Sequence, residues 1–415
     1  MKVVHLSTLD YGGAGLAALR IHLSLRTMGI DSTLHVSEKN CSEESVVEVE
    51  KATWNSYKLP RNRFFNRLMR FMLRHGPFKT ESEKDKKYLR AVAPQNRSLF
   101  TSPISSYSLC DHPAIKDADI IHLHWIENFV DYRSFFASIN KPVVWTAHDE
   151  NIGYGGFHYK QIFIRYYPYY KHLEDKYSDI KRKALSRIGD LTMVSLSQEM
   201  DDFCHNDSFM KDRTSVIIPN SVDYHKFVIQ DKEFARRVIK VPENSIVFVF
   251  CAYNIDDPFK GLNVLLEALE TLSIPNLVLL CVGKGNVPRR TNIKIYKAGL
   301  VINEDFLSLL LSAADLFVLP SCQEAFAQTP LEALCCGVPI VAFPVSGTSY
   351  LINEDNGIRC NGFTVNALIE GIQKALETKY DPSKIRQDII NRFSPELIAE
   401  RYADLYESII TRCLR

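Results

Sequence analysis

The sequence has no long hydrophobic run, no excess of charge of one sign and no paired cysteine motif, and each absence excludes a class of protein. Its longest apolar stretch, residues 246–253, has the length of a strand, whereas a membrane-spanning helix needs about 20 apolar residues. The 50 Lys and Arg against 49 Asp and Glu leave a net charge of +1, which excludes a nucleic-acid binder that acts through its whole surface. The ten cysteines form no C-x-x-C pair, which excludes a cysteine-based zinc site and fits a reducing compartment.

The first residues and the overall composition indicate an ordinary globular protein. Met1 to Leu6 lead directly into the polar segment Ser7 to Asp10, without the apolar core of a secretory signal, so we expect a cytoplasmic protein. The chain is 46% hydrophobic and 24% charged, and its 415 residues suffice for two large domains or three ordinary ones.

Short runs rich in Val, Ile and Leu alternate with longer amphipathic segments, which is typical of parallel strands joined by helices. The strands predicted in the first half are Lys2–Ser7, Thr33–Val36, Ile120–His124, Val143–Thr146 and Leu191–Ser195. Those in the second half are Ser215–Ile218, Ile246–Cys251, Asn276–Val282, Ile293–Tyr296, Leu316–Leu319 and Ile340–Phe343. Two such series predict an α/β protein of two doubly wound domains, with turn signals such as Pro219-Asn220 where they meet near residues 210–245.

Glycines, histidines, lysines and carboxylates follow the predicted strands. These segments are Gly12-Gly13-Ala14-Gly15, His124-Trp125, His148-Asp149, Tyr253-Asn254, Gly283-Lys284-Gly285 and Ser321-Cys322-Gln323-Glu324. In an open parallel sheet a ligand binds beyond the carboxyl ends of the strands. Two sheets that face one another would place these polar edges along an interdomain cleft.

Two carboxylates in the second half give the strongest chemical signal. Glu324 follows a predicted strand, and Glu332 lies in the next helix after seven intervening residues. Local rules explain Glu332 equally well as part of a capping box, with Thr329 as N-cap and Gly337 ending the helix. Glu324 has no such role, because a loop carboxylate beside an apolar strand needs solvent or a hydroxyl-rich partner.

The glycine-rich loop after the first strand is a weaker signal. Gly12 and Gly13 allow backbone N–H groups to approach an anion at the start of a helix. The segment does not fit G-x-G-x-x-G, which argues against a nicotinamide-dependent dehydrogenase.

The region from Glu324 through Glu332 to Gly337-Val338-Pro339 resembles the carboxylate-pair signature of retaining glycosyltransferases with the two-domain GT-B fold, the large family 4. Further matches follow in order over residues 1–365. They are the Gly12-Gly13 loop, Ile121-His122-Leu123-His124-Trp125, Trp145-Thr146-Ala147-His148-Asp149, Gly155-Gly156-Phe157-His158-Tyr159, Ile218-Pro219-Asn220-Ser221-Val222-Asp223 and Lys260-Gly261. The resemblance implies that a nucleoside-diphosphate sugar is the donor.

The resemblance also implies roles for individual residues. Lys260 would offset the diphosphate charge, Glu332 would hold the ribose hydroxyls and Glu324 the hydroxyls of the donor sugar, while backbone N–H groups near Gln328 and Thr329 would face the phosphates. The remaining donor-binding positions are expected at Gly12, Gly13, Gly283, Ala325 and Phe326. No cofactor and no metal is expected.

His148 and Asp149 are the catalytic candidates of the first half, beside Lys260 and Glu324. In the family, the histidine of this motif lies by the donor sugar and the acceptor hydroxyl, and Asp149 could accept a proton; a satisfied structural histidine is the alternative for His148. His122 and His124 share a strand face but lack a third ligand at suitable spacing, so we expect no metal there.

Two features fall outside this pattern. The arginine that often precedes the lysine-glycine pair in the family is missing, with Ala252-Tyr253-Asn254 in its place, so a second phosphate cation is not assigned. Arg63, Arg67, Arg70 and Arg74 form one stripe of an amphipathic cationic segment. This stripe suits an anionic membrane or a lipid-diphosphate acceptor, and a helix docked on the first domain is the alternative.

We therefore predict an α/β protein of GT-B type with two Rossmann-like domains facing across a cleft. Residues 1–212 would bind the acceptor, 213–392 the donor, and a helix over 393–415 could cross back to the first domain. The predicted activity is a metal-independent, retaining transfer of a sugar to a saccharide or lipid-linked acceptor in surface polysaccharide synthesis, at the inner face of the plasma membrane and without nucleic acid. The alternatives are a nucleotide-sugar epimerase of the same fold and a catalytically silent binding protein.

Overall fold

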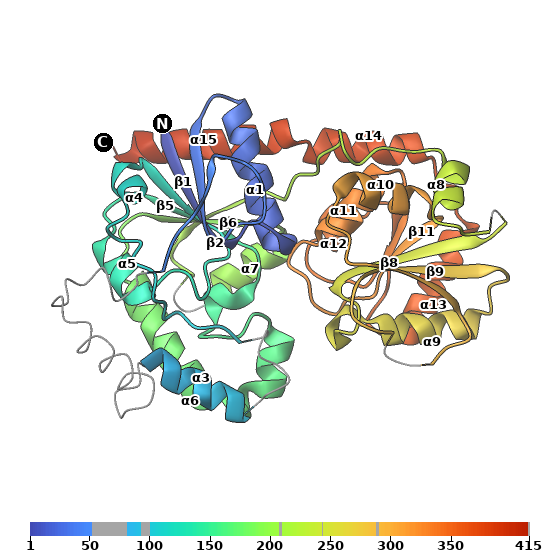
Figure 1. Cartoon of the computed structure of the whole chain (residues 1–415), viewed down its shortest axis with the longest axis horizontal. Helices are drawn as coiled ribbons and strands as arrows, with labels where there is room; N and C mark the ends of the chain where they lie inside the picture. Colours follow the sequence, from blue (N-terminus) through green and yellow to red (C-terminus); the bar gives the residue numbers. More distant parts are fainter. Residues whose placement is uncertain (52–80, 93–99, 207–209, 243, 288–289, 414–415) are drawn as a thin grey trace, which may run out of the picture. The chain divides into compact units, whose positions relative to one another are not determined.

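The computed structural model describes residues 1–51, 81–92, 100–206, 210–242, 244–287 and 290–413, and it divides the chain into two compact units. The first unit comprises residues 1–195, 201–216 and 405–415, and the second comprises residues 196–200 and 217–404. Each unit has a parallel sheet with helices around it (Figure 1). The predicted α/β class with two doubly wound sheets is confirmed.

The sheet of the first unit has seven strands in the order β3-β2-β1-β4-β5-β6-β7. The strands are β1 (Lys2–Leu9), β2 (Asp31–Glu38), β3 (Val46–Glu48), β4 (Ile120–Leu123), β5 (Val143–Ala147), β6 (Leu191–Ser195) and β7 (Thr214–Ile217). The assignment of Ser215–Ile218 to the second series of strands is wrong, since this segment is β7 and extends the first sheet. The turn signal Pro219-Asn220 follows this strand, so the chain leaves the first sheet only after it.

Helices in two positions accompany this sheet. Most lie in the connections between consecutive strands, and the C-terminal helix ends in this unit. They are α1 (Gly12–Thr27), α3 (Glu81–Val92), α4 (Pro113–Asp117), α5 (Tyr132–Ser138), η2 (Glu150–Gly153), α6 (Lys160–Leu185), α7 (Gln198–Asn206) and α15 (Pro395–Cys413). Near the end of α15, the Tyr406 hydroxyl lies 2.6 Å from His122 Nδ1 in the sheet, so the last turns of this helix are tied to β4.

The sheet of the second unit has six strands in the order β10-β9-β8-β11-β12-β13. The strands are β8 (Ile246–Asn254), β9 (Leu277–Lys284), β10 (Lys294–Gly299), β11 (Leu316–Leu319), β12 (Ile340–Ala342) and β13 (Gly357–Arg359). The helices are α8 (Lys232–Val238), η3 (Pro258–Lys260), α9 (Leu262–Leu272), α10 (Glu304–Ser312), α11 (Gln328–Cys335), α12 (Thr348–Leu351), α13 (Val365–Glu377) and α14 (Pro382–Phe393).

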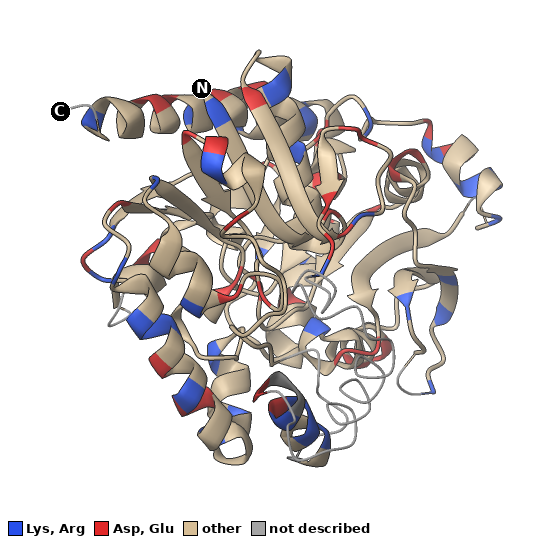
Figure 2. Cartoon of the chain, turned by 60° about the vertical axis from the view of Figure 1, so that its left-hand side comes forward, with Lys and Arg blue, Asp and Glu red and all other residues tan. Residues whose placement is uncertain are grey.

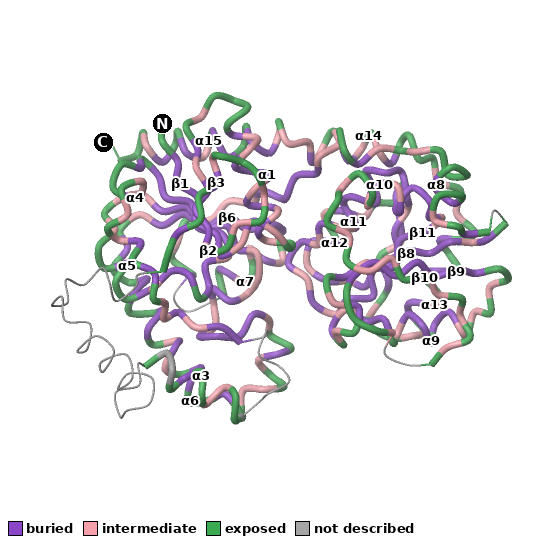
Figure 3. The backbone as a smooth tube through the Cα atoms, viewed as in Figure 1, coloured by how far each residue is buried: buried purple, intermediate pink, exposed green. Residues whose placement is uncertain are grey.

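Strand β8 shows why the second sheet is buried on both faces. Val247 and Val249 belong to an apolar cluster with residues of α10, α11 and α14, whereas Phe248 and Phe250 belong to another with residues of α9 and α13. Successive side chains point to opposite faces of a strand, so an uninterrupted apolar run can serve two layers of helices. Figure 3 shows the buried strands at the centre of each unit, with exposed segments around them.

Buried histidines form part of the core of the first unit. His22 of α1 is fully buried, with Nδ1 2.7 Å from Ser32 Oγ and Nε2 2.9 Å from Ser45 Oγ. His35 of β2 is 3% exposed and lies beside Thr33 Oγ1. Burial, with a smaller contribution from nearby basic groups, lowers the pKa of each of these histidines to about 4. Both are therefore neutral at pH 7.

These two histidines predict that the protein loses stability in mild acid. Their folded pKa values lie below the unfolded value near 6.5, so the unfolded chain takes up protons first and stability falls from pH 6.5 down to about 4. Each histidine should cost about 2 kcal/mol of unfolding free energy at pH 5 relative to pH 7.5.

Urea unfolding followed by circular dichroism at both pH values tests this expectation. The His22→Asn variant should show a shallower loss of stability with falling pH than the parent protein. The exposed His172 of α6 provides the matched control, and His172→Asn should leave the dependence unchanged. Equal slopes for His22→Asn and the parent protein would contradict the assignment.

Candidate functional site

The loop after β8 places Lys260 at the carboxyl edge of the second sheet. Lys260 ends η3, and Gly261 turns the chain into α9 with a φ of +79°. A Cβ atom at Gly261 would lie 2.0 Å from the carbonyl oxygen of Pro320, the residue after β11. Glycine is therefore required both by the backbone conformation and by the close approach of the two loops.

Lys260 and Glu324, both predicted from sequence, meet in this structure. Lys260 Nζ lies 2.6 Å from Glu324 Oε1, and the two side chains are 28% and 13% exposed. Burial alone would lower the pKa of Lys260, but the Glu324 carboxylate outweighs burial and raises it above its usual value. The lysine is therefore a fixed cation, held at the sheet edge by a carboxylate that still has a second oxygen.

The loop after Glu324 is held by contacts within the second unit. Asn220 donates from Nδ2 to the carbonyl oxygen of Phe326 at 3.4 Å, and Gly347 lies against the backbone of Ala325 and Phe326. The side chains of Ala325 and Phe326 are buried, and Phe326 belongs to the apolar core. Any contact of these two predicted donor-binding residues with a ligand would therefore come from their backbone.

Helix α11 does not use the predicted capping box. The helix begins at Gln328 with Ala327 as N-cap and no side-chain cap, so Thr329 lies inside the first turn. The capping interpretation of Glu332 is therefore wrong. Ala327 occupies the N-cap position, with an extended backbone at φ −68° and without a polar side chain. Gly337 follows the helix with a φ of +75°, so the predicted stop is confirmed.

Glu332 is 3% exposed and lies close to the strand that leads to Lys260. Burial, followed by the charge of Glu332, raises the pKa of Cys251 in β8 to about 12. Thr329 and Lys260 also act on this thiol, so α11, β8 and η3 converge here. The structure thus gathers Lys260, Glu324 and Glu332 at one sheet edge, where sequence reasoning placed them.

Strand β9 adds a cation at the same edge. Gly283 has a φ of +138°, and a Cβ atom there would lie 1.8 Å from the carbonyl oxygen of Ala252, so this glycine serves the packing of β9 on β8. The next residue, Lys284, pairs with Asn254 and is exposed, with Nζ 4.1 Å from the centre of the Tyr253 ring. Within the described residues Lys284 has no carboxylate partner.

In the first unit, the predicted glycine loop forms the start of α1. Gly12 has a φ of +71°, and no atom lies within 4 Å of a Cβ built on Gly12 or Gly13. A Cβ on Gly15, by contrast, would lie 2.6 Å from the Leu9 carbonyl oxygen. Gly15 is therefore a packing residue, whereas Gly12 and Gly13 leave open space beside the helix N-terminus.

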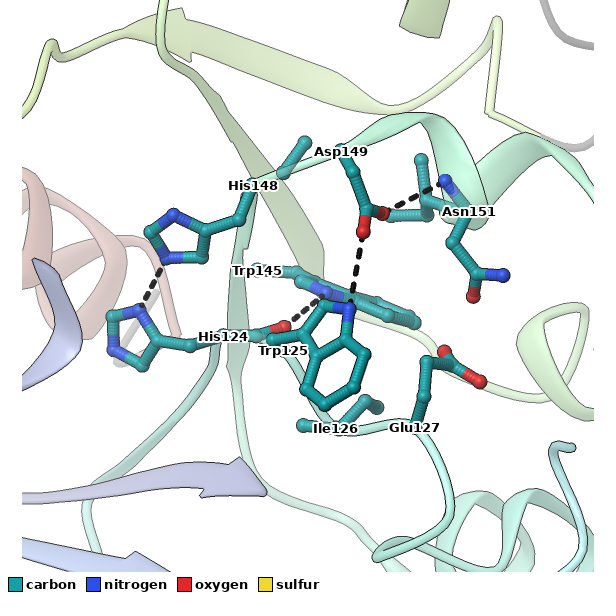
Figure 4. A pocket seen from close by; sticks show the side chains of 10 residues that line it. His124, Trp125, Ile126, Glu127, Trp145, His148, Asp149 and Asn151 are labelled. Carbon is teal, nitrogen blue, oxygen red and sulfur yellow. Dashed lines mark hydrogen bonds between the residues drawn. The ribbon is translucent and has the colours of Figure 1, made fainter. Parts of the chain in front are cut away.

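His148 and Asp149 follow β5, and Figure 4 shows them with the residues around them. Asp149 accepts hydrogen bonds from Trp125 Nε1 at 3.0 Å and from the Asn151 backbone at 2.9 Å, and its Oδ2 lies 2.6 Å from His158 Nδ1. Burial alone would raise the pKa of Asp149, but His158 and the other donors outweigh burial and lower it. A carboxylate engaged in this way is a weak proton acceptor.

The space beside these residues is small. The cavity lined by Trp125, His148 and Asp149 has a volume of about 10 Å³, enough for about one water molecule. Burial lowers the pKa of the half-buried His148 to about 4, so its imidazole is neutral at pH 7. The cavity beside these two predicted catalytic residues is therefore too small to hold a sugar.

A buried ion pair that sequence reasoning missed supports this region. Lys181 of α6 has no exposed side-chain surface, and its Nζ lies 3.4 Å from Glu127 Oε1. Lys181 also donates to the Asn151 carbonyl oxygen at 2.9 Å, and the Tyr132 hydroxyl donates to Glu127 at 2.7 Å. No local sequence signal links these residues, because they come from separate elements.

The structure supplies the third histidine that the sequence did not indicate. His5 of β1 is in register with His122 of β4, and His5, His122 and His124 have ligand atoms within 4.8 Å of one another. Both ring nitrogens of His122 are engaged, however, by the Tyr406 hydroxyl at 2.6 Å and by Thr146 Oγ1 at 2.8 Å. The cluster is therefore described better as hydrogen-bonded imidazoles than as a metal centre.

The predicted membrane-binding residues are four arginines of one segment. Arg63, Arg67, Arg70 and Arg74 lie outside the described residues. Lysines, arginines and carboxylates are interspersed on the helices and loops seen in Figure 2, in keeping with the balanced charge. None of the helices that the structure describes combines the length and apolar character needed to cross a bilayer.

Comparison with known proteins agrees with this arrangement. Residues 231–392 match the family described as "Glycosyl transferases group 1". An uncharacterized glycosyltransferase of Methanocaldococcus jannaschii is 24% identical over 309 residues, 70% of this chain and 75% of that protein. The UDP-Gal:alpha-D-GlcNAc-diphosphoundecaprenol alpha-1,3-galactosyltransferase of Escherichia coli is 23% identical over 233 residues, 52% of this chain but only 60% of that enzyme.

A solved structure extends the likeness to the whole fold. The Anabaena protein Alr3699/HepE, in complex with UDP and glucose, superposes with a TM-score of 0.65 at 18% identity, over 98% of this chain and 100% of that chain. The chain therefore has the GT-B fold, and residues 231–392 in its second unit match the family of group 1 glycosyltransferases.

Proposed function

We propose that this protein transfers a sugar from a nucleoside-diphosphate sugar, with retention of anomeric configuration, to a saccharide or lipid-linked saccharide acceptor. The observation that carries the proposal is the Lys260–Glu324 pair at 2.6 Å, which lies at the carboxyl edge of the second sheet and inside the matched family region. Donor binding is assigned to the second unit and acceptor binding to the first.

The charges of the second unit suit such a donor. A nucleoside diphosphate gains negative charge as the glycosidic bond breaks, and a preorganised ammonium group stabilises that charge. Lys260 would supply this group, aided by backbone N–H groups near Gln328 and Thr329 at the start of α11. Glu324 Oε2 would accept from hydroxyls of the donor sugar, and the buried Glu332 from the ribose hydroxyls.

The first unit fits a reaction without a strong protein base. His148 is neutral with a pKa of about 4, and Asp149 is engaged by three donors. Neither group is suited to remove a proton from an acceptor hydroxyl. We propose that the leaving diphosphate takes this proton during attack on the face from which it departs, which gives retention without a protein nucleophile or a metal.

The acceptor is proposed by analogy. The name of the Escherichia coli relative states that it acts on a diphosphoundecaprenol-linked GlcNAc. A lipid-linked acceptor of this kind would place the present protein in surface polysaccharide synthesis, in the cytoplasm and at the inner face of the plasma membrane. The arginine stripe from Arg63 to Arg74 would then contact anionic lipid headgroups.

Replacement of Glu324 tests the donor site. Glu324→Gln should lower kcat/KM at least about 100-fold, because a neutral amide loses the charge that fixes Lys260 and its interactions with sugar hydroxyls. The measurement is product formation with uridine, guanosine and adenosine diphosphate sugars, after a thermal-shift panel has identified the donor. The exposed Glu354 of the same unit gives the control, since Glu354→Gln should retain full activity.

The same assay separates the alternative functions. Consumption of the donor to an epimer without acceptor would identify an epimerase. Donor binding without any turnover would identify a silent binding protein. Nuclear magnetic resonance of the product should show the donor's anomeric configuration, and an inverted product or a loss of activity with EDTA would contradict the proposed mechanism.

If Glu332 binds the ribose hydroxyls, the protein should distinguish ribonucleotide donors from their 2′-deoxy analogues. The parent protein should prefer a ribonucleotide donor over its 2′-deoxy analogue by about tenfold or more in kcat/KM, because the analogue lacks a hydroxyl that the Glu332 carboxylate would bind. Glu332→Gln should reduce this preference, while Glu354→Gln should keep it. An undiminished preference in Glu332→Gln would assign the ribose contact elsewhere.

We predict that Lys284 is a second cation for the donor phosphates, in place of the arginine that the sequence lacks. Lys284→Met should raise the donor KM about tenfold, with a smaller effect on kcat, because an exposed cation contributes to binding more than to the reacting centre. Lys374, an exposed lysine of α13, offers the matched control as Lys374→Met. Equal KM values for the two variants would remove Lys284 from the site.

A further inference from the structure

Three imidazoles form a hydrogen-bonded row across neighbouring strands of the first sheet. His5 Nδ1 lies 2.9 Å from His124 Nε2, and His124 Nδ1 lies 3.1 Å from His148 Nε2. His5 comes from β1, while His124 and His148 follow β4 and β5, the next two strands in the sheet. Figure 4 shows the outer bond of this row, between His124 and His148.

The row contains only neutral rings. His5 is fully buried and His124 is 2% exposed, and burial together with neighbouring imidazoles keeps the pKa of both far below the usual value. The titratable groups that face them are His22, His35 and His122, and Asp149 stands beside His148. A neutral imidazole has one N–H donor and one lone pair.

This constraint leaves two proton arrangements. Both ring nitrogens of His124 are used, so one donates and the other accepts. Either every N–H points outward, from His5 through His124 to His148, or every N–H points inward. In the outward case His5 Nε2 carries a lone pair, and in the inward case it carries a hydrogen.

The inner end of the row decides between them. His5 Nε2 is buried and has no hydrogen-bond partner among the described residues. Buried N–H groups without a partner are rarer in proteins than buried acceptors without one. The outward arrangement is therefore favoured, with the hydrogen of His148 on Nδ1, which makes no hydrogen bond with the described residues.

We infer that His5 and His124 act as positioning residues that fix His148 in the tautomer with N–H at Nδ1, so that this edge presents a neutral hydrogen-bond donor and not a base. Only the identity of the acceptor atom rests on the proposed function, which would make it an oxygen of a bound sugar or of the acceptor substrate. The tautomer itself is a property of the free protein.

A metal bound by His5, His122 and His124 is the competing interpretation. Two nitrogen ligands of a tetrahedral zinc ion at about 2.0–2.1 Å would lie roughly 3.4 Å apart. His5 Nδ1 and His124 Nε2 are closer, at the length of a hydrogen bond, and His122 has hydroxyl partners on both ring nitrogens. These contacts favour the hydrogen-bonded row.

Nuclear magnetic resonance of the full chain with ¹⁵N-labelled histidine tests the inference without substrate. His148, assigned by its loss in His148→Asn, should show a protonated Nδ1 and an unprotonated Nε2. In His124→Phe, which removes the row at its centre, the His148 signals should average between the two tautomers. A protonated Nε2 or averaged tautomers in the parent protein would overturn the inference.

Two further measurements separate the competing outcomes. Addition of Zn²⁺ should leave the His5 and His124 signals unchanged, whereas tight binding with loss of these signals would replace the row by a metal site. In the transfer assay His148→Asn keeps an N–H near the Nδ1 position and should retain activity within about tenfold of the parent protein. His148→Asp, an acceptor of similar size, should lose at least about 100-fold.

The nuclear magnetic resonance test and the kinetic test can refute the inference and the proposed function independently of one another. The expected tautomer in a protein without transferase activity would refute the proposed function and leave the inference intact. Transferase activity with the opposite tautomer, or equal activity in His148→Asn and His148→Asp, would refute the inference and leave the proposed function intact.

Discussion

Parallel strand pairing is the constraint on which both units depend. All strands of a parallel sheet end at the same edge, so residues far apart in sequence meet there if each follows a strand. Lys260 and Glu324 are 64 positions apart and touch because one follows β8 and the other follows β11, its neighbour in the sheet. His124 and His148 meet in the first unit for the same reason, through β4 and β5. Direct strand pairing thus brings together each pair of groups on which the proposals rest.

The sequence predicted the parts of this arrangement that depend on local pattern. Apolar runs predicted eleven strands at approximately their observed residues, ten of them in the correct sheet. The position of Lys260 and Glu324 after strands placed both at a sheet edge. The role of Glu332 was harder to predict, because Thr329 and Pro330 have the pattern of a helix start. The helix begins earlier, at Gln328, and the extended N-cap residue is Ala327. The strand β7 was assigned to the wrong sheet because four residues carry no information about their partner.

Contacts that depend on register could not be predicted. Nothing near His5 indicates that its strand pairs with β4, and only that register, His5 opposite His122, brings a third imidazole into the cluster. The buried pair of Lys181 and Glu127 is similar, since a lysine in a long helix and a glutamate in a loop are ordinarily solvated. Such pairs are stable only because Tyr132, Asn151 and other partners satisfy the remaining polar atoms once the fold has formed.

The Lys260–Glu324 pair is compatible with a bound donor because it leaves polar atoms unused. An ammonium group has three N–H donors, and one contact with Glu324 Oε1 leaves two for phosphate oxygens. The carboxylate likewise retains Oε2 for hydroxyls. A donor would therefore add its contacts to an existing ion pair without separating the charges, and the geometry of both groups would already be set before it arrives. Preorganisation of this kind removes the cost of reorienting charged side chains during the reaction, which is the main advantage that a fixed charge in a protein has over the same charge in water.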